Sequence, residues 1–302
     1  MKPWLLELGL ACNNGCRFCS LAYRQSKEGG VEPAGESVLA ALASGRRGHS
    51  SVVLVGGEPT LFDGLAGWVG HARKLGYSRV GLQTNGRRLA YASYCGSLEE
   101  AGLTDVDIAL HGSRAAMHDY HTRVEGSFKQ TISGIREVVR SGLELCVSTT
   151  LTRSNYRHLL EILEVLAHLK VESWHLSAVY PAGRADEDFS SLAPAFSMLR
   201  PHLEALLIRA SDLGIEVLTS GVPTCIAPTN KSDAKWGRGV YGSPCQGCTV
   251  QDACPGLSED YIHAFGWEEC KPVEGGEEPE HTKASAQRHH LLGGVGLTHQ
   301  DP

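Results

Sequence analysis

The sequence lacks the features that direct a chain into or across a membrane. No apolar run reaches the roughly 20 residues that a membrane-spanning helix requires. After Met1 the chain enters the strand-like segment WLLELGL, without the apolar core and cleavage site of a signal peptide. Long basic blocks and internal repeats are absent too, and the net charge of −6 argues against nucleic acid as the main partner. These absences predict a cytoplasmic globular protein, whose 302 residues suffice for one large core and a small appended domain.

Cysteine, in contrast, is abundant and clustered. Ten cysteines in a reducing compartment are more typical of metal ligands than of disulfides. Cys12, Cys16 and Cys19 lie in the run CNNGCRFC, with no fourth ligand nearby. A cubane that is held by four cysteines tends to carry electrons, whereas one held by three keeps an iron open to an outside ligand. A structural zinc site and a disulfide cluster are the alternatives for these three residues.

Apolar, β-branched runs alternate with helical patterns along the first two thirds of the chain. Six such βα units predict an α/β fold, in which parallel strands curl into a full or partial TIM-type barrel. The catalytic residues of such a barrel lie at the C-terminal ends of its strands. We expect strands at residues 4–10, 51–55, 79–83, 106–111, 143–150 and 173–179, and helices at residues 36–44, 64–75, 96–102, 128–141, 155–169 and 198–213.

Glycine-rich and polar turns follow the expected strands. Gly56 and Gly57 allow close approach of the backbone to a ligand, Glu58 is an anionic acceptor, and Pro59 fixes the turn into the next segment. This set suits a cationic amine. Polar turns with Thr84-Asn85 and with His111-Gly112-Ser113 follow the third and fourth strands.

The run CNNGCRFC, with Phe18 before its last cysteine, resembles the signature of the radical S-adenosylmethionine (SAM) enzymes. The resemblance implies a [4Fe-4S] cluster on Cys12, Cys16 and Cys19, whose open iron is chelated by SAM. Reductive cleavage of SAM then yields a 5′-deoxyadenosyl radical, which abstracts hydrogen from an organic substrate. The GGEP sequence resembles the family motif that binds the amino group of SAM, and the TNG turn resembles one near its methionyl part.

The segment from Leu110 to Phe128 resembles a further family pattern, "S-L-H/D-G … H-D … G-S-F". Its leading serine, which often lies near the SAM ribose or carboxylate, is Ala109 here, so we expect Ser113 or Thr149 to supply the hydroxyl. Arg123 is a candidate partner for the SAM carboxylate, because a guanidinium can bind it through two hydrogen bonds. The resemblance thus implies this set of SAM contacts: Gly56, Gly57, Glu58, Pro59, Thr84, Asn85, His111, Ser113, Arg123 and Thr149.

The last expected strand is followed by the sequence PAGRA at residues 181–185, which resembles a stretch that borders the adenine and the substrate in this family. His175, on that strand, either points inward as a substrate contact or is hydrogen-bonded in the core, and we favour the core position. Cys95 and Cys146 read as small buried apolar side chains.

A second cysteine group follows between Cys225 and Cys270 and includes the run CQGCTVQDAC. This region resembles the twitch domain, a shorter relative of the SPASM domain that carries an auxiliary [4Fe-4S] cluster. Because position 258 is serine, we expect one auxiliary cluster rather than two. Zinc is the alternative metal. The expected ligands are Cys225, Cys245, Cys248 and Cys254, with Cys270 as the alternative to Cys225.

The sequence therefore predicts three parts: a radical SAM partial barrel at residues 1–215, an auxiliary-cluster domain at residues 216–275 and a tail at residues 276–302 that is flexible or acts as a lid. The predicted activity is oxidation, bond formation or epimerisation of a natural-product or cofactor precursor, with flavodoxin or ferredoxin as electron donor. One alternative is maturation of a ribosomally made peptide. The alternative from another class is a non-catalytic iron–sulfur electron carrier or redox sensor.

Overall fold

A computed structural model describes residues 3–29, 33–227, 232–233 and 239–273 of the chain. The tail that the sequence predicts at residues 276–302 lies outside the described residues. None of the helices in the described ranges is both long and apolar enough to cross a membrane.

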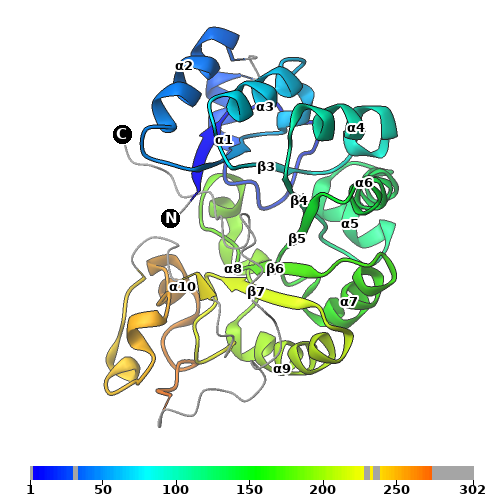
Figure 1. Cartoon of the computed structure of the whole chain (residues 1–302). Coiled ribbons are helices and arrows are strands. Elements are labelled where there is room, and N and C mark those ends of the chain that lie inside the picture. Colours follow the sequence, from blue (N-terminus) through cyan, green and yellow to red (C-terminus); the bar gives the residue numbers. More distant parts are fainter. Residues whose placement is uncertain (1–2, 30–32, 228–231, 234–238, 274–302) are drawn as a thin grey trace.

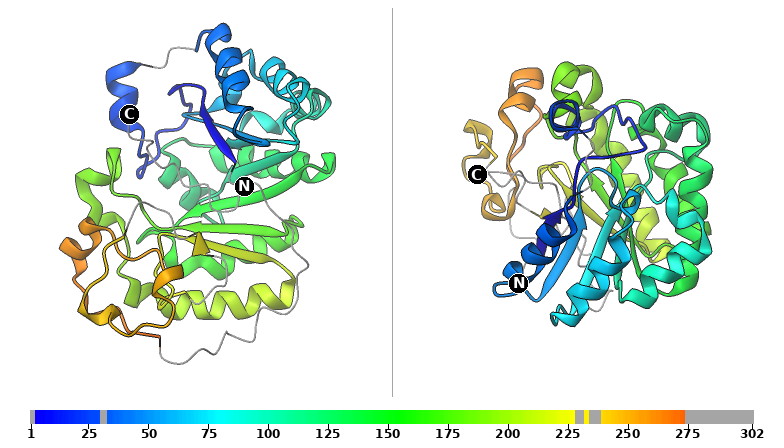
Figure 2. Two further views of the ribbon diagram at one scale, coloured as in Figure 1. Left: turned by 60° about the vertical axis from the view of Figure 1, so that its left-hand side comes forward. Right: turned by 90° about the horizontal axis from the view of Figure 1, so that it is seen from above.

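One curved, parallel sheet organises the molecule (Figures 1 and 2). Its strands follow one another in chain order and neighbouring strands are parallel, so that β2 to β7 are joined by crossover connections. β1 and β8 are the two ends of this sheet, which makes it a partial barrel, as predicted. The strands are β1 (Trp4–Glu7), β2 (Ser51–Val55), β3 (Arg79–Thr84), β4 (Asp105–Ala109), β5 (Glu144–Thr150), β6 (Ser173–Ser177), β7 (Glu216–Ser220) and the two-residue β8 (Ser232–Asp233).

The sheet continues past the six strands that the sequence indicates. β7 pairs with β6 from Ser173–Glu216 to Ser177–Ser220. The sequence prediction missed it because its most deeply buried residues include the polar Thr219 and Ser220, so the segment has no apolar run. The sheet therefore extends beyond residue 215, where the sequence places the end of the barrel.

Helices cover the outer face of the sheet (Figure 1). α6 shows why, because Ile132, Ile135 and Val138 form an apolar stripe that is buried against the sheet. The sequence missed α1, which buries no residue, and α5, which is short and contains buried histidines. The helices are α1 (Ala22–Glu28), α2 (Gly35–Gly45), α3 (Leu65–Lys74), α4 (Ala92–Ala101), α5 (Ala115–Thr122), α6 (Ser127–Ser141), α7 (Leu159–His168), α8 (Phe189–Leu192), α9 (Phe196–Leu213) and α10 (Glu259–Phe265).

The last described segment, residues 239–273, lies beside β7 (Figure 2). It contains little regular structure besides α10 and an antiparallel bridge between Val240 and Leu257. Tyr261 of α10 stacks on Phe196 at the start of α9, with ring centroids 4.2 Å apart. Its hydroxyl also accepts a hydrogen bond from the Phe196 amide (2.6 Å). These contacts join the second cysteine group to the barrel.

Candidate active site

A cavity of about 250 Å³ opens at the C-terminal ends of the strands. It lies where the chemistry of parallel α/β barrels takes place. Three thiols line it together with side chains from β3, β4, β5 and β6. Its lining includes Cys12, Asn14, Cys16, Phe18, Cys19, Gln25, Gly56, Gly57, Gln83, Thr84, Asn85, Asp107, Ala109, His111, Ser148, Thr150, His175, Ser177 and Tyr180.

The cysteine loop, residues Cys12–Cys19, connects β1 to α1 and brings the three thiols to this cavity. The loop is docked on the C-terminus of α5, where helical carbonyls have no partner within the helix. There the Gly15 amide donates to the Thr122 carbonyl (2.8 Å), and the Arg17 amide donates to the His121 carbonyl (3.0 Å). These bonds fix the loop although it contains neither helix nor strand.

The three thiols are largely shielded from water. Burial raises the pKa of Cys12 to about 11 and also raises the pKa values of Cys16 and Cys19. Neighbouring thiols raise the pKa of Cys16 further, because two thiolates so close repel each other. Without a ligand the loop therefore holds protonated thiols, which must release their protons when they bind metal.

Gly56 and Gly57 bring the end of β2 against the chain that follows β1. The Gly57 amide donates to the Gly9 carbonyl (2.8 Å), and the Glu58 amide donates to the Ala11 carbonyl (2.7 Å). A Cβ atom on Gly57 would lie 2.3 Å from the Ala11 oxygen, so no side chain fits there. The two glycines thus serve a close approach between backbones and also line the cavity.

Glu58 itself is fully buried and is not among the lining residues. Its carboxylate accepts hydrogen bonds from the Thr84 hydroxyl (2.6 Å), the Asn85 amide (2.7 Å) and the Thr60 amide (3.1 Å). Burial raises its pKa, against the effect of these donors. Glu58 therefore links the C-terminal ends of β2 and β3 through buried hydrogen bonds. Pro59 is buried beside it at the start of a short 3-10 helix.

His111 follows β4 and lines the cavity as a neutral imidazole. Its Nδ1 accepts a hydrogen bond from the Thr150 amide (3.3 Å), so its proton resides on Nε2. Burial, followed by the neighbouring His118 and His121, holds its pKa well below the usual range for histidine. The edge of Phe18 packs against the imidazole ring, with the centroids 4.7 Å apart.

Five of the ten residues expected to contact SAM are not among the lining residues: Glu58 and Pro59, described above, and Ser113, Thr149 and Arg123. Ser113 donates to the Glu161 carboxylate (2.8 Å) away from the cavity. Thr149 is buried and accepts a hydrogen bond from the Trp174 indole (2.9 Å). Arg123 ends α5 with a left-handed backbone (φ 57°). Arg123 lies beside the cysteine loop, because a Cβ atom placed on Gly15 would be 3.7 Å from the Cβ atom of Arg123.

Sequence reasoning missed Asp107, Gln83 and Ser148, which all line the cavity. Alternation along the strands would have found them, because residues i and i+2 of a strand share a face. Ser148 and Thr150 therefore face the cavity, whereas Thr149 between them does not. The Asp107 carboxylate accepts hydrogen bonds from the Ser148 hydroxyl (2.5 Å) and the Gln83 amide (3.1 Å). Burial raises its pKa to about 6.

His175 combines the two positions that the sequence left open. It lines the cavity and is also buried, with Nε2 2.9 Å from the Ser220 hydroxyl. Burial lowers its pKa to about 4, so it is neutral at physiological pH.

The H-D … G-S-F pattern turns out to form a helix cap. The Asp119 carboxylate accepts hydrogen bonds from the Gly126 amide (2.8 Å), the Ser127 hydroxyl (2.7 Å) and the Phe128 amide (2.7 Å). Asp119 thereby satisfies free amides at the N-terminus of α6. This bridge stabilises the connection between α5 and α6, next to the carbonyls that hold the cysteine loop.

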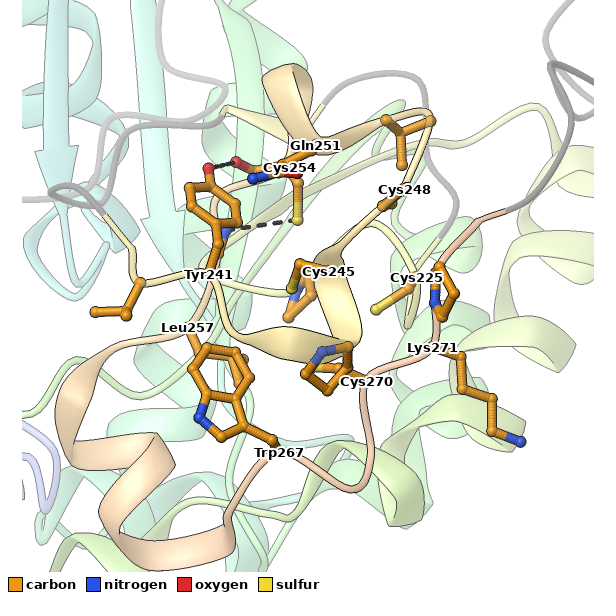
Figure 3. A pocket seen from close by; sticks show the side chains of 16 residues that line it. Cys225, Tyr241, Cys245, Cys248, Gln251, Cys254, Leu257, Trp267, Cys270 and Lys271 are labelled. Atoms are coloured by element: carbon orange, nitrogen blue, oxygen red, sulfur yellow. Dashed lines mark hydrogen bonds between the residues drawn. The ribbon is translucent and has the colours of Figure 1, made fainter.

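The second cysteine group surrounds a smaller cavity, of about 20 Å³ (Figure 3). Cys225 and Cys270, the two candidates for the fourth ligand, both line this cavity. A hydrogen bond joins their thiols. That bond lowers the pKa of Cys225. Among the described residues, no three His, Cys, Asp or Glu side chains are arranged to hold a single metal ion. The cysteines that line this cavity are Cys225, Cys245, Cys248, Cys254 and Cys270.

Cys95 and Cys146 lie apart from both groups and are buried, on α4 and β5. Each of the ten cysteines is a free thiol.

Three thiols and a glycine loop around one cavity, at the mouth of a partial α/β barrel, define an active site suited to a cluster with one open iron. The protein-family sequence model described as the radical SAM superfamily matches residues 6–166 of this chain. The chain therefore belongs to this superfamily. It is therefore an enzyme. The cofactors of the superfamily are a [4Fe-4S] cluster and SAM.

Curated relatives match the same part of the chain. The AdoMet-dependent heme synthase of Oleidesulfovibrio alaskensis is 27% identical over 179 residues, which cover 59% of this chain and 46% of the relative. The probable GTP 3′,8-cyclase of Sulfurisphaera tokodaii is 29% identical over 179 residues, which cover 59% of this chain and 56% of the relative. The chain thus spans about half the length of these relatives.

Solved structures share the fold. Streptococcus suis SuiB bound to the precursor peptide SuiA superposes with a TM-score of 0.59 at 16% identity, over 72% of this chain and 49% of that chain. Native anSMEcpe with bound AdoMet and the Kp18Cys peptide gives a TM-score of 0.54 at 15% identity, over 71% of this chain and 63% of that chain. At these identities the likeness concerns the fold alone.

Proposed function

We propose that the chain cleaves SAM reductively at a [4Fe-4S] cluster held by Cys12, Cys16 and Cys19, and that its substrate binds in the same cavity. The cluster and SAM together would supply a 5′-deoxyadenosyl radical that abstracts hydrogen from the substrate. One observation carries the proposal: the three thiols line one cavity together with Gly56, Gly57 and the Thr84-Asn85 turn. A carrier of electrons has no need of such a cavity beside its cluster.

The residues that line the cavity are the better candidates for SAM contacts. Gly56, Gly57, Thr84 and Asn85 would face the methionyl part, with Glu58 bracing the two turns that carry them. His111 presents a neutral imidazole with its proton on Nε2, so it is a hydrogen-bond donor without charge.

Alternation along β5 also suggests a replacement for the serine that is Ala109 here. Ser148 and Thr150 line the cavity and so are better placed than Ser113 or Thr149 to supply the hydroxyl.

The floor of the cavity favours a substrate that donates hydrogen bonds or carries positive charge. Asp107, Gln83, Ser148 and His175 point into it from four adjacent strands. Asp107 is the charged side chain among the described lining residues, and two donors leave its carboxylate with free lone pairs. An amine or a hydroxyl of a small natural-product or cofactor precursor fits this floor. A ribosomally made peptide is the alternative substrate, and the likeness in fold to SuiB does not choose between them.

We further propose that the part of residues 216–275 that follows β7 forms a twitch-like domain with one auxiliary [4Fe-4S] cluster. Five thiols around one cavity support this assignment. Cys245, Cys248 and Cys254 would be ligands, with Cys225 as the fourth and Cys270 as its alternative. Zinc in place of iron at this second site would leave the brown colour of the first cluster but would halve the iron content of the chain and add zinc, which metal analysis detects.

The proposed enzyme works in the cytoplasm and receives its electron from a flavodoxin or ferredoxin. Free thiols at all ten cysteines are consistent with a reducing compartment.

Anaerobic incubation of the reconstituted protein with SAM and dithionite tests the proposal. We expect the wild-type protein to release 5′-deoxyadenosine and the triple variant Cys12→Ala, Cys16→Ala, Cys19→Ala to release none while retaining the iron of the second group. Cys95→Ala, which removes a buried thiol far along the chain from both groups, serves as the control and should cleave SAM at the wild-type rate. Persistent cleavage by the triple variant would refute the assignment.

A further inference from the structure

Two arginines from different strand ends reach the cysteine loop. Arg87 follows the turn after β3, and Arg184 lies in the PAGRA segment after β6. Both side chains are half-buried, and among the described residues neither forms an ion pair with a carboxylate. Their positive charges are therefore available to the loop.

Arg87 binds the first half of the loop. Its Nη1 donates to the Asn13 carbonyl (2.5 Å) and to the Asn14 side-chain oxygen (2.9 Å). Its Nε donates to Gln130 on α6 (2.7 Å), which fixes the guanidinium plane. Asn85 adds a further contact on this side, from its side-chain amide to the Asn13 side-chain oxygen (2.7 Å).

Arg184 binds the second half. Its Nη1 donates to the carbonyls of Gly15 (2.9 Å) and Cys16, and its amide donates to the Cys19 carbonyl (3.0 Å). The preceding residue, Gly183, has a left-handed backbone (φ 58°), and a Cβ atom there would lie 2.4 Å from the Ser20 oxygen. Glycine at 183 is thus what lets Arg184 approach the loop so closely.

We propose that Arg87 and Arg184 form a two-sided guanidinium clasp, which holds the cysteine loop in its cluster-binding conformation and favours the reduced form of the cluster bound there. The inference rests on the proposed function, because it assigns a role toward the [4Fe-4S] cluster on Cys12, Cys16 and Cys19. It makes both arginines positioning residues, since they contact the loop backbone rather than a reacting group.

The two parts of this role have separate physical causes. A guanidinium presents several donors in one plane, so it can bind two oxygens of the loop at once, whereas an ammonium group is a point charge. Reduction adds one negative charge to a cluster that three thiolates already surround. A nearby positive charge stabilises that extra charge, and more strongly in a half-buried site than in water.

Substitution by lysine and by glutamine separates the effect of the planar hydrogen-bond donors from the effect of the positive charge. Arg87→Lys and Arg184→Lys keep the charge and lose the planar pair of donors, whereas Arg87→Gln and Arg184→Gln lose the charge. Arg140→Gln is the matched control, because Arg140 is exposed on α6 and pairs only with Glu137 among the described residues. The reconstituted full chains are titrated electrochemically, and the EPR signal that SAM alters is followed. Loss of iron to a chelator is measured in parallel.

We expect the glutamine variants to have a more negative midpoint potential than wild type and the lysine variants to keep the wild-type potential but to lose iron several-fold faster. Glutamine variants that fail to retain a cluster, beside lysine variants that do, also support the clasp. The clasp is refuted if cluster-bearing glutamine variants titrate at the wild-type potential, or if the lysine variants lose iron no faster than Arg140→Gln. A wild-type signal that SAM does not alter refutes the proposed function itself, before any variant is compared.

Discussion

Asp107→Asn offers a sharp test of the buried carboxylate on the cavity floor. Burial, partly offset by hydrogen bonds from Ser148 and Gln83, raises the pKa of Asp107 from 3.8 to about 6. A shift of about two pKa units corresponds to roughly 3 kcal/mol of linked stability, at about 1.4 kcal/mol per unit. Because the folded chain holds the proton more tightly than the unfolded chain, this stability is present below pH 3.8 and is lost as the pH rises through about 6.

The substitution removes the charge and keeps the shape. The new side-chain oxygen can still accept from the Ser148 hydroxyl, and Gln83 can turn its amide oxygen toward the new NH₂ group. We therefore expect the variant to be more stable than wild type near neutral pH, by up to about 3 kcal/mol, and the difference to vanish near pH 4. The same variant should turn over substrate more slowly, because it lacks the anionic acceptor.

Urea unfolding of the iron-free chain gives the free energy of unfolding of wild type and of Asp107→Asn. It is measured under reducing conditions between about pH 4 and pH 8, and the difference between the two proteins is compared across this range. Asp212→Asn, at an exposed position on α9, accounts for the simple loss of one negative charge. Parallel pH profiles for wild type and Asp107→Asn would show that burial does not raise the pKa of Asp107, and the reasoning would then fail.

Three further predictions concern the support of the site. Asp119→Ala removes the cap of α6 and should lower the free energy of unfolding by about 1–2 kcal/mol, as urea unfolding would show; an unchanged midpoint contradicts the capping role. Gly57→Ala places a methyl group 2.3 Å from the Ala11 oxygen and should abolish formation of 5′-deoxyadenosine, while the matched Gly67→Ala, which meets nothing within 4 Å, should not. Cys225→Ser should release the iron of the second group, whereas Cys270→Ser should retain it; iron analysis that gives the reverse assigns the fourth ligand to Cys270.

The sequence revealed the barrel and the cofactor side of its mouth because both are encoded locally. Apolar runs alternate with helical patterns, and the cysteine run and the GGEP turn each lie within a few residues of a strand end. Their convergence on one cavity follows from the parallel sheet, in which all strand ends meet at the same edge. β7 was missed because its buried residues Thr219 and Ser220 are polar.

The residues that the sequence misplaced depend on side-chain direction and on contacts between distant segments. Thr149 and its neighbours Ser148 and Thr150 are all hydroxyl residues, and only the pleat of β5 decides which of them face the cavity. The contact of Arg184 with Gly15 joins residues 169 positions apart, so no local pattern could indicate it.

The position of the family match within the chain bears on where the substrate is recognised. The match covers residues 6–166, and thus the cysteine loop, the glycine turn and the strands up to β5. His175, Ser177 and Tyr180 line the cavity from beyond that range, and the second cysteine group, which lines the smaller cavity, also lies beyond it. The matched part of the chain therefore carries the cysteine loop and the glycine turn, whereas the wall formed by β6 and the segment after it lies outside the match. Only β5 separates Asp107 on β4 from this wall on β6, so we expect the substrate to contact both. Exchange of His175 or Ser177 should therefore change which compound is used. It should leave cleavage of SAM alone intact.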